Sequence, residues 1–260
     1  MSGTRLRARL EAGEVIKMIN PHDSSYSLAA RLIGHGADAV FVDCEHGSWS
    51  FEDVRMTQAA VRAAGGDVIV RPRSHDRSLI IRYINCGADG VMVPMVDDAD
   101  EARAIVDAVQ YASSHDKHST LVICMIENVD TARNKLDAML DVEGIDVFFL
   151  GPSDLTKSMG LPPPRGNEDW NCGVKEVITE TIGRITACGK IAGTLVREDN
   201  ARHYNKAGAQ FLYLHCGSDV AGGICQLRSG AFQLRMRVVL DRAVWPREVR
   251  LPYRIPHGKM

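Results

Sequence analysis

The sequence predicts an α/β fold, a single (β/α)8 TIM barrel, on three observations. Eight short apolar runs rich in β-branched residues recur along the chain. The stretches between them carry helical periodicity instead of hairpin turns, as in parallel βα units. The length of 260 residues also suits a barrel, whose eight units need roughly 250 residues. An open doubly wound sheet is the weaker alternative.

The predicted strands follow one another at residues 15–20, 37–43, 67–71, 90–94, 121–127, 146–150, 190–195 and 210–215. Helical segments link them at residues 25–32, 51–64, 79–85, 98–111, 130–140, 174–188 and 202–207, and a last helix is expected over 220–239. Gly36, Gly87, Gly144 and Gly208 each stand shortly before a strand, where glycine suits the end of the preceding helix. The chain therefore consists of eight consecutive predicted βα units.

Two segments depart from this pattern. Residues 161–170 contain three consecutive prolines and are predicted to form a loop over one end of the barrel, after the sixth strand. Residues 241–260 hold three further prolines among basic and aromatic residues, which favours an extended arm packed on this subunit or on a neighbour. The predicted organisation is thus a barrel over residues 1–240 followed by a C-terminal arm over residues 241–260.

Composition narrows the classes of function. The 31 basic and 33 acidic residues nearly balance and form no long basic stretch, so neither nucleic acid nor an anionic membrane is an expected partner. The first 14 residues lack the apolar core of a signal peptide, and no apolar run approaches the roughly 18 residues of a membrane span. Seven scattered cysteines without a C-x-x-C pair indicate a reducing compartment. We expect a cytoplasmic protein.

Side chains at the carboxyl ends of barrel strands converge on one site, so these positions supply the candidate functional residues. The candidates are Asn20, Asp43, Glu45, His46, Arg71, Pro94, Glu127, Ser153, Asp154, Gly193 and His215. Residues 215–219 resemble a phosphate-binding turn of other barrels, although the glycine there also suits a strand-to-helix turn, which we favour.

Glu127 and Asp154 follow two successive apolar strands, at the same end of the predicted barrel. Two carboxylates there would repel each other unless a cation lies between them, and Mg²⁺ takes one or two protein carboxylates. The alternative is that Asp154 caps a helix over 155–159 and Glu127 pairs with Arg71. Gly151 to Asp154 also place free backbone N–H groups at a helix start, where a carboxylate or phosphate binds well.

Asp43, Glu45 and His46 form the densest polar cluster, directly after the second strand. A histidine whose tautomer is held by a carboxylate is a useful general base, although a polar loop with a surface histidine would look the same. Arg71 ends an apolar strand, where a buried guanidinium needs an anionic partner. That partner is either a substrate carboxylate or enolate, or Glu45.

Lysine placement bears on the choice between two ways of stabilising an enolate. Lys17 is the one lysine well inside a predicted strand, and the sixth strand, the usual barrel position for a Schiff-base lysine, contains none. A Schiff-base mechanism is therefore not expected, and a metal ion is the expected electrophile.

Several short motifs together resemble the HpcH/HpaI aldolase family, the class II pyruvate aldolases that include 4-hydroxy-2-oxo-heptane-1,7-dioate and 2-dehydro-3-deoxyglucarate aldolases. The resemblance runs from about residue 5 to residue 240. Its motifs lie at residues 24–26, 42–46, 70–72, 91–96 with 100–103, 126–127, 141–146, 151–155 and 159–160. Each motif alone is weak, and the set is specific.

The resemblance implies aldol cleavage or synthesis of a 4-hydroxy-2-oxo acid through a pyruvate enolate, with a 2-oxo acid and an aldehyde as partners. It implies that Glu127 and Asp154 hold Mg²⁺, Mn²⁺ or Co²⁺ and that Arg71 contacts the enolate oxygen. His46, oriented by Asp43, would be the base. Backbone N–H groups of the Gly151 to Asp154 turn, at Ser153 and Asp154, would hold the pyruvate carboxylate. It also implies a homo-oligomer, a hexamer or trimer of dimers, with the last helix exchanged between subunits.

The chain departs from the family pattern at three places. Met125 stands where familiar members have glutamine, Asn85 stands where some carry an aspartate that reaches across the subunit interface, and residues 111–119 replace a longer segment. These changes affect the aldehyde side and the subunit contacts. The rival interpretations are an acyl-CoA thioester lyase of the citrate lyase β-subunit type, which lacks the expected basic cluster here, and a non-catalytic barrel.

Overall fold

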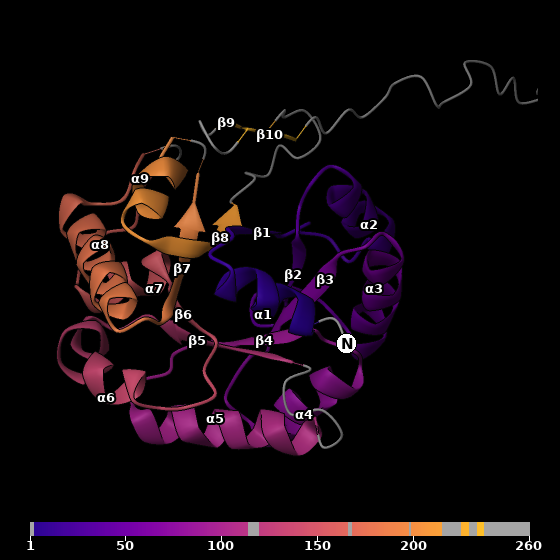
Figure 1. Cartoon of the computed structure of the whole chain (residues 1–260), viewed down its shortest axis with the longest axis horizontal. Helices are drawn as coiled ribbons and strands as arrows, with labels where there is room; N and C mark the ends of the chain where they lie inside the picture. Colours follow the sequence, from indigo (N-terminus) through magenta and orange to yellow (C-terminus); the bar gives the residue numbers. More distant parts are fainter. Residues whose placement is uncertain are drawn as a thin grey trace, which may run out of the picture.

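The computed structural model describes residues 3–113, 120–165, 168–197 and 199–214, and the short strands over 225–228 and 233–236. Eight parallel strands form a closed barrel in sequence order, because β1 pairs with both β2 and β8. Helices surround this ring of strands (Figure 1). The predicted (β/α)8 barrel is confirmed, and the open sheet is excluded.

All eight predicted strands are present, with shifts of one or two residues at their ends. They are β1 (Ile16–Ile19), β2 (Ala39–Asp43), β3 (Asp67–Arg71), β4 (Gly90–Val93), β5 (Leu121–Ile126), β6 (Val147–Leu150), β7 (Ile191–Val196) and β8 (Ala209–Leu214). Nearly every residue of these strands is buried, because a parallel barrel covers both faces of its sheet. One face packs against the helices and the other fills the barrel.

The helices between the strands also lie close to their predicted positions. They are α2 (Tyr26–Gly34), α3 (Phe51–Ala63), α4 (Arg77–Asn85), α5 (Ala99–Ala112), α6 (Leu136–Leu140), α7 (Pro152–Ser158), α8 (Cys172–Ala187) and α9 (Ala201–Lys206). The glycines predicted to end helices, Gly36, Gly87, Gly144 and Gly208, all have positive φ, between 90° and 114°. Over the described residues, no helix has both the length and the apolar character needed to cross a membrane.

Helix α1 (Gly3–Glu11), which the sequence analysis did not predict, lies across the middle of the ring of strands (Figure 1). Its Leu6 and Leu10 are buried with the side chains that fill the barrel. Its arginines pair with aspartates at the beginnings of three strands. The pairs are Arg5 with Asp67 at 2.5 Å, Arg7 with Asp146 at 2.6 Å and Arg9 with Asp38 at 2.8 Å. Helix α1 therefore closes the amino-terminal end of the barrel.

Three of the aspartates that begin strands also fix the strand register. Asp38 accepts the backbone N–H of Lys17 at 2.8 Å, Asp89 that of Val68 at 2.9 Å, and Asp146 that of Val122 at 2.8 Å. Each carboxylate thus ties the start of its own strand to a neighbouring strand. Because this end is occupied by α1 and its ion pairs, the opposite end is left for a functional site.

The structure differs from the predictions in two further helices. The predicted helix over 130–140 begins as a π-helix, η1 (Thr131–Lys135), before α6, and Arg184 of α8 donates to the carbonyl of Ala132 at 2.7 Å. The prediction of a last helix over 220–239 is wrong where that range is described. Strands β9 (Cys225–Arg228) and β10 (Gln233–Met236) pair antiparallel there. Three glycines in the range, at 222, 223 and 230, each cost a helix interior about 1 kcal/mol.

Asp67 makes the stability of the barrel dependent on pH. Its side chain is buried, its Oδ1 has no hydrogen-bond partner, and burial raises the pKa of its carboxyl to about 6. The folded protein then holds a proton between about pH 4 and pH 6 that the unfolded chain has released, so the Asp67 contribution to stability falls as the pH rises through this window.

We therefore expect the wild type to lose up to about 3 kcal/mol of unfolding free energy relative to Asp67→Asn as the pH rises from about 4 to about 6.5. Urea denaturation at several pH values measures this difference. A difference that does not change with pH would contradict the role given to Asp67.

Candidate active site

A cavity of about 320 Å³ opens at the carboxyl ends of the barrel strands. Its walls bring together the residues that the sequence analysis placed in one site, namely Asp43, His46, Arg71, Glu127, Gly151, Ser153 and Asp154. Asn20 also lines the cavity. Gly193 does not, and the side chain of Phe149 packs close to where a Cβ of residue 193 would lie. Pro94 is not among the residues that line the cavity, and His215 lies outside the described residues.

Arg71 and Asp43 form the most strongly connected pair in the site. They end the neighbouring strands β3 and β2 and stand opposite each other in register. Arg71 donates from Nε to Asp43 Oδ1 at 2.9 Å and from Nη2 to Oδ2 at 2.6 Å, and its Nη1 lies 3.1 Å from Glu45. Burial by itself would raise the pKa of Asp43, but the hydrogen bonds and charge of Arg71 outweigh it, so that pKa lies below its usual value.

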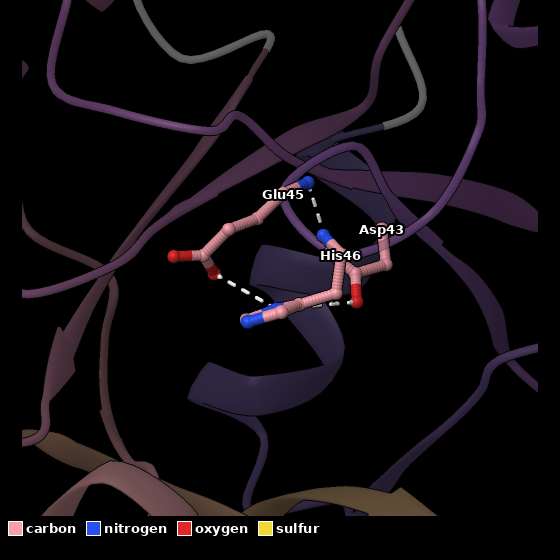
Figure 2. Close-up of side chains that lie close together, drawn as sticks. All are labelled: Asp43, Glu45 and His46. Carbon is pink, nitrogen blue, oxygen red and sulfur yellow. Dashed lines mark hydrogen bonds and ion pairs between the residues drawn. The ribbon is translucent and has the colours of Figure 1, made fainter.

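His46 is held beside this pair with an exposed ring. Its backbone N–H, like that of Glu45, donates to Asp43 Oδ1. Its Nδ1 lies 2.8 Å from Arg71 Nη2. The same atom lies 3.5 Å from Glu45 and 4.0 Å from Asp43 (Figure 2). Because a guanidinium only donates, Nδ1 is the acceptor in this arrangement and Nε2 carries the ring proton. The nearer carboxylate to His46 is that of Glu45.

Glu127 is the most deeply placed acid of the site, with 3% of its surface exposed. Its Oε2 accepts the backbone N–H of Met95 at 2.9 Å. Burial raises the pKa of its carboxyl to about 7, and the charge of nearby Asp154 adds to this rise. The earlier alternative, in which Glu127 pairs with Arg71, is not what the structure shows, because Arg71 pairs with Asp43 and Glu45.

The Met95 amide is a part of the site that the sequence analysis missed. Met95 has φ of +54°, a left-handed conformation that is uncommon for a residue with a side chain. His75 hydrogen-bonds the carbonyl of Pro94, and the N–H of Asp97 donates to Glu101 at 2.8 Å, so the turn is fixed on both sides. Since the contribution comes from a backbone group, no side-chain pattern in the sequence could have revealed it.

Asp154 lies in the first turn of α7, which begins at Pro152 with Gly151 as N-cap. The alternative interpretation, Asp154 as the cap of a helix over 155–159, is therefore wrong. Its carboxylate instead accepts from Lys157 Nζ at 2.8 Å. Lys157 also lines the cavity but is largely exposed, and the sequence analysis overlooked it, although its spacing of three residues from Asp154 was a usable signal.

Two groups of acidic residues could hold a divalent cation. Asp43, Glu45 and His46 offer ligand atoms within 4.8 Å of one another (Figure 2). The guanidinium of Arg71 already contacts all three and supplies the positive charge that they need. Within the described part of the chain, no arginine or lysine bonds to Glu127, and Asp154 has only an exposed lysine. Glu127 is buried without a basic partner and Asp154 is partly buried beside one exposed lysine, so these two carboxylates fit Mg²⁺ or Mn²⁺ better than the first group does.

The floor of the cavity is apolar. Met92, Met125 and Phe149 line it from strands β4, β5 and β6, and all three side chains are buried. Met125 is on β5, two residues before Glu127, which directly follows the strand. Side chains two residues apart along a strand point to the same side, so Met125 and Glu127 both face the cavity. A substrate bound at Glu127 and Asp154 would rest on thioether and aromatic groups.

Known proteins share this architecture. A crystal structure of an HpcH/HpaI aldolase/citrate lyase family protein from Burkholderia cenocepacia J2315 superposes with a TM-score of 0.73 at 21% identity, covering 81% of this chain and 91% of that one. The crystal structure of citrate synthase SbnG superposes with a TM-score of 0.71 at 26% identity, covering 83% and 92%. The first likeness extends only to the fold. A (β/α)8 barrel with carboxylates at the carboxyl ends of its strands is typical of an enzyme.

Sequence relatives identify the family. The family model for HpcH/HpaI aldolase/citrate lyase matches residues 21–222. A 2-keto-3-deoxy-L-rhamnonate aldolase of Escherichia coli is 32% identical over 230 residues, covering 79% of this chain and 84% of the relative, and one of Klebsiella pneumoniae is 33% identical over 194 residues, covering 66% and 71%. The chain belongs to the HpcH/HpaI aldolase/citrate lyase family. It is an enzyme, a carbon–carbon lyase of the aldolase type.

The position of Gly151 provides a test of the Glu127 site. A Cβ at Gly151 would lie 2.4 Å from Glu127 Oε1, whereas one at Gly183 in α8 would meet nothing within 4 Å. We expect Gly151→Ala to displace the Glu127 carboxylate and weaken Mn²⁺ binding by about tenfold or more. Gly183→Ala is the matched control and should leave Mn²⁺ binding unchanged while raising stability by about 0.5 to 1 kcal/mol. Titration with Mn²⁺ and thermal unfolding measure both, and equal Mn²⁺ affinity in the two variants would contradict the assignment.

Proposed function

We propose that this protein is a metal-dependent class II aldolase that cleaves or forms a 4-hydroxy-2-oxo acid, with pyruvate or a close analogue and an aldehyde as the products of cleavage. The observation that carries this proposal is the buried Glu127 carboxylate beside Asp154, in one cavity with Arg71 and His46. The activity named for the E. coli and K. pneumoniae relatives supports it, because a 2-keto-3-deoxy sugar acid is a 4-hydroxy-2-oxo acid.

Glu127 and Asp154 would hold the divalent ion, Mg²⁺, Mn²⁺ or Co²⁺. When bound, this ion supplies Lewis-acid stabilisation of the negative charge that develops on the 2-oxo oxygen. Arg71 supplies a second positive charge at the same cavity, held in place by Asp43. A fixed guanidinium does not have to reorganise as the charge develops, which is the main source of electrostatic catalysis.

The remaining groups would bind and orient the 2-oxo acid. Ser153 and Asp154 stand in the first turn of α7, where backbone N–H groups have no helical acceptor and can receive the substrate carboxylate. Met92, Met125 and Phe149 would contact the C3 carbon. His46 would take the proton of the C4 hydroxyl on Nε2 once its ring proton has moved to Nδ1, where Glu45 or Asp43 would accept the Nδ1–H in place of the contact with Arg71.

The proton and electron balance of cleavage follows from these roles. The C4 hydroxyl gives its proton to His46, the C3–C4 bond breaks, and C4 leaves as the carbonyl of the aldehyde. The electron pair of the broken bond passes to the 2-oxo oxygen as an enolate. A proton from water then adds at C3 and gives the 2-oxo acid product, and His46 releases its own proton to water. Synthesis is the same sequence in reverse, with His46 returning its proton.

The oligomeric state and the location in the cell are predictions. We propose a homo-oligomer, a hexamer or trimer of dimers, in the cytoplasm, with Asn85 at the surface of α4 available to a neighbouring subunit. The C-terminal arm over residues 241–260, most of the shortened link over 111–119 and the expected exchange of a last helix fall outside the described residues. Light scattering of the full chain measures the oligomeric state.

The substrate class is tested with a panel of 4-hydroxy-2-oxo acids. We expect the protein with Mn²⁺ or Mg²⁺ to release pyruvate from at least one of them, and EDTA to abolish this release because the buried acids then lack their cation. Pyruvate is followed with lactate dehydrogenase and NADH. Turnover of an acyl-CoA thioester without turnover of any 4-hydroxy-2-oxo acid would instead favour the citrate lyase type of reaction.

The role of His46 is tested by separating its step from enolate formation. We expect His46→Gln to lower the rate of cleavage by about 10² to 10⁴, the usual contribution of general acid–base catalysis. Exchange of the C3 protons of pyruvate in D₂O, followed by NMR, should persist, because metal and Arg71 remain. His35→Gln, at the C-cap of α2, is the control with full activity. Full cleavage activity in His46→Gln would remove His46 as the base.

A further inference from the structure

A second cavity, of about 240 Å³, lies against the active-site cavity. Asn20, His22, Asp43 and His46 line both cavities, so the two share a wall that contains the proposed base. The remaining lining of the second cavity comes from the segments that follow β1 and β2. We refer to it as the side cavity.

The walls of the side cavity are fixed by the backbone. Asn20 ends the β1 segment, is buried, and accepts the N–H of His22 at 2.8 Å, which supports the left-handed φ of +57° at His22. Across from it, a Cβ at Gly47 would lie 2.4 Å from the carbonyl of Asp43 and 2.8 Å from the indole of Trp49. Only glycine lets the indole pack this closely against the loop. The side cavity is therefore a built feature of the two loops.

The lining of the side cavity is polar and carries no basic side chain apart from histidine. Ser24 and Ser48 contribute hydroxyl groups, and Asp23 contributes an exposed carboxylate. The other lining carboxylate, that of Asp43, is already neutralised by Arg71. Hydroxyl and carboxylate oxygens accept hydrogen bonds from the hydroxyl groups of a ligand, whereas a ligand carboxylate would be repelled by the charge of Asp23 even where a serine hydroxyl donates to it.

We propose that the side cavity binds the aldehyde half of the substrate, and that Asp23 selects a neutral hydroxylated aldehyde against one that carries a carboxylate. The inference rests on the aldolase function proposed above. The carbon chain of the substrate runs from the 2-oxo acid at Glu127 and Asp154 past the C4 hydroxyl at His46. Since His46 lines both cavities, the atoms beyond C4 enter the side cavity.

The proposal is tested in the synthetic direction, with pyruvate as donor and three acceptors. Glyceraldehyde is neutral and hydroxylated, propanal is neutral without hydroxyl groups, and succinic semialdehyde is anionic. We expect the wild type to prefer glyceraldehyde by about tenfold in kcat/KM over the other two, as one hydrogen-bonded or repelled group is worth about that factor. Preference for succinic semialdehyde would overturn the proposal.

Variants of Asp23 test the selection by charge. Asp23→Asn should raise the ratio of kcat/KM for succinic semialdehyde to that for propanal by about threefold to tenfold, and Asp23→Lys should raise it further. Glu52→Gln is the control, because it removes one negative charge, as Asp23→Asn does. The Glu52 side chain is largely exposed on α3 and lines neither cavity. The ratio in this variant should equal that of the wild type. An unchanged ratio in both Asp23 variants would overturn the proposal.

Pyruvate alone separates the failure of this proposal from the failure of the proposed function. The wild type with Mn²⁺ should exchange the C3 protons of pyruvate in D₂O without any aldehyde. If exchange occurs and the acceptor ratios do not respond to Asp23, the side cavity proposal falls and the aldolase function stands. If neither exchange nor aldol product is found, both fall.

Discussion

The burial of one carboxylate, that of Glu127, is the constraint on which the rest of the site depends. A carboxyl group with 3% exposure loses its hydration, and this raises its pKa to about 7. Around it, Gly151 must lack a side chain, and Met95 adopts an uncommon left-handed backbone to offer its N–H. Such an arrangement is costly for stability, and a divalent cation shared with Asp154 would offset the cost.

The distribution of arginines distinguishes the two ends of the barrel. At the amino-terminal end of the barrel, arginines of α1 pair with the aspartates that begin three strands. At the mouth, Arg71 compensates Asp43 and Glu45 and contacts His46. Among the residues that the structure describes, Glu127 has no basic partner and Asp154 has the exposed Lys157. The same barrel thus has one end where arginines pair with the aspartates and one end where a divalent cation would fit at Glu127 and Asp154.

The repeating strands were predictable because a parallel barrel buries both faces of each strand, which leaves a nearly continuous apolar run in the sequence. The strand-end candidates were predictable for the same reason, and the cavity brings together His46, Arg71, Glu127 and Asp154. The Met95 amide was missed because backbone groups leave no side-chain signal. Helix α1 was missed because its apolar side is short, with only Leu6 and Leu10 one turn apart among three arginines. The final helix was wrong because periodicity was given more weight than glycine.

The most direct measurement is the affinity for Mn²⁺ in variants of the two acidic groups, determined from the electron paramagnetic resonance of the free ion. Glu127→Gln and Asp154→Asn should each weaken binding by about tenfold or more, because each removes a carboxylate ligand. Glu45→Gln should leave it unchanged, because Arg71 already compensates that carboxylate. Weaker binding in Glu45→Gln, with unchanged affinity in Glu127→Gln and Asp154→Asn, would place the metal in the cluster of Asp43, Glu45 and His46 and contradict the account.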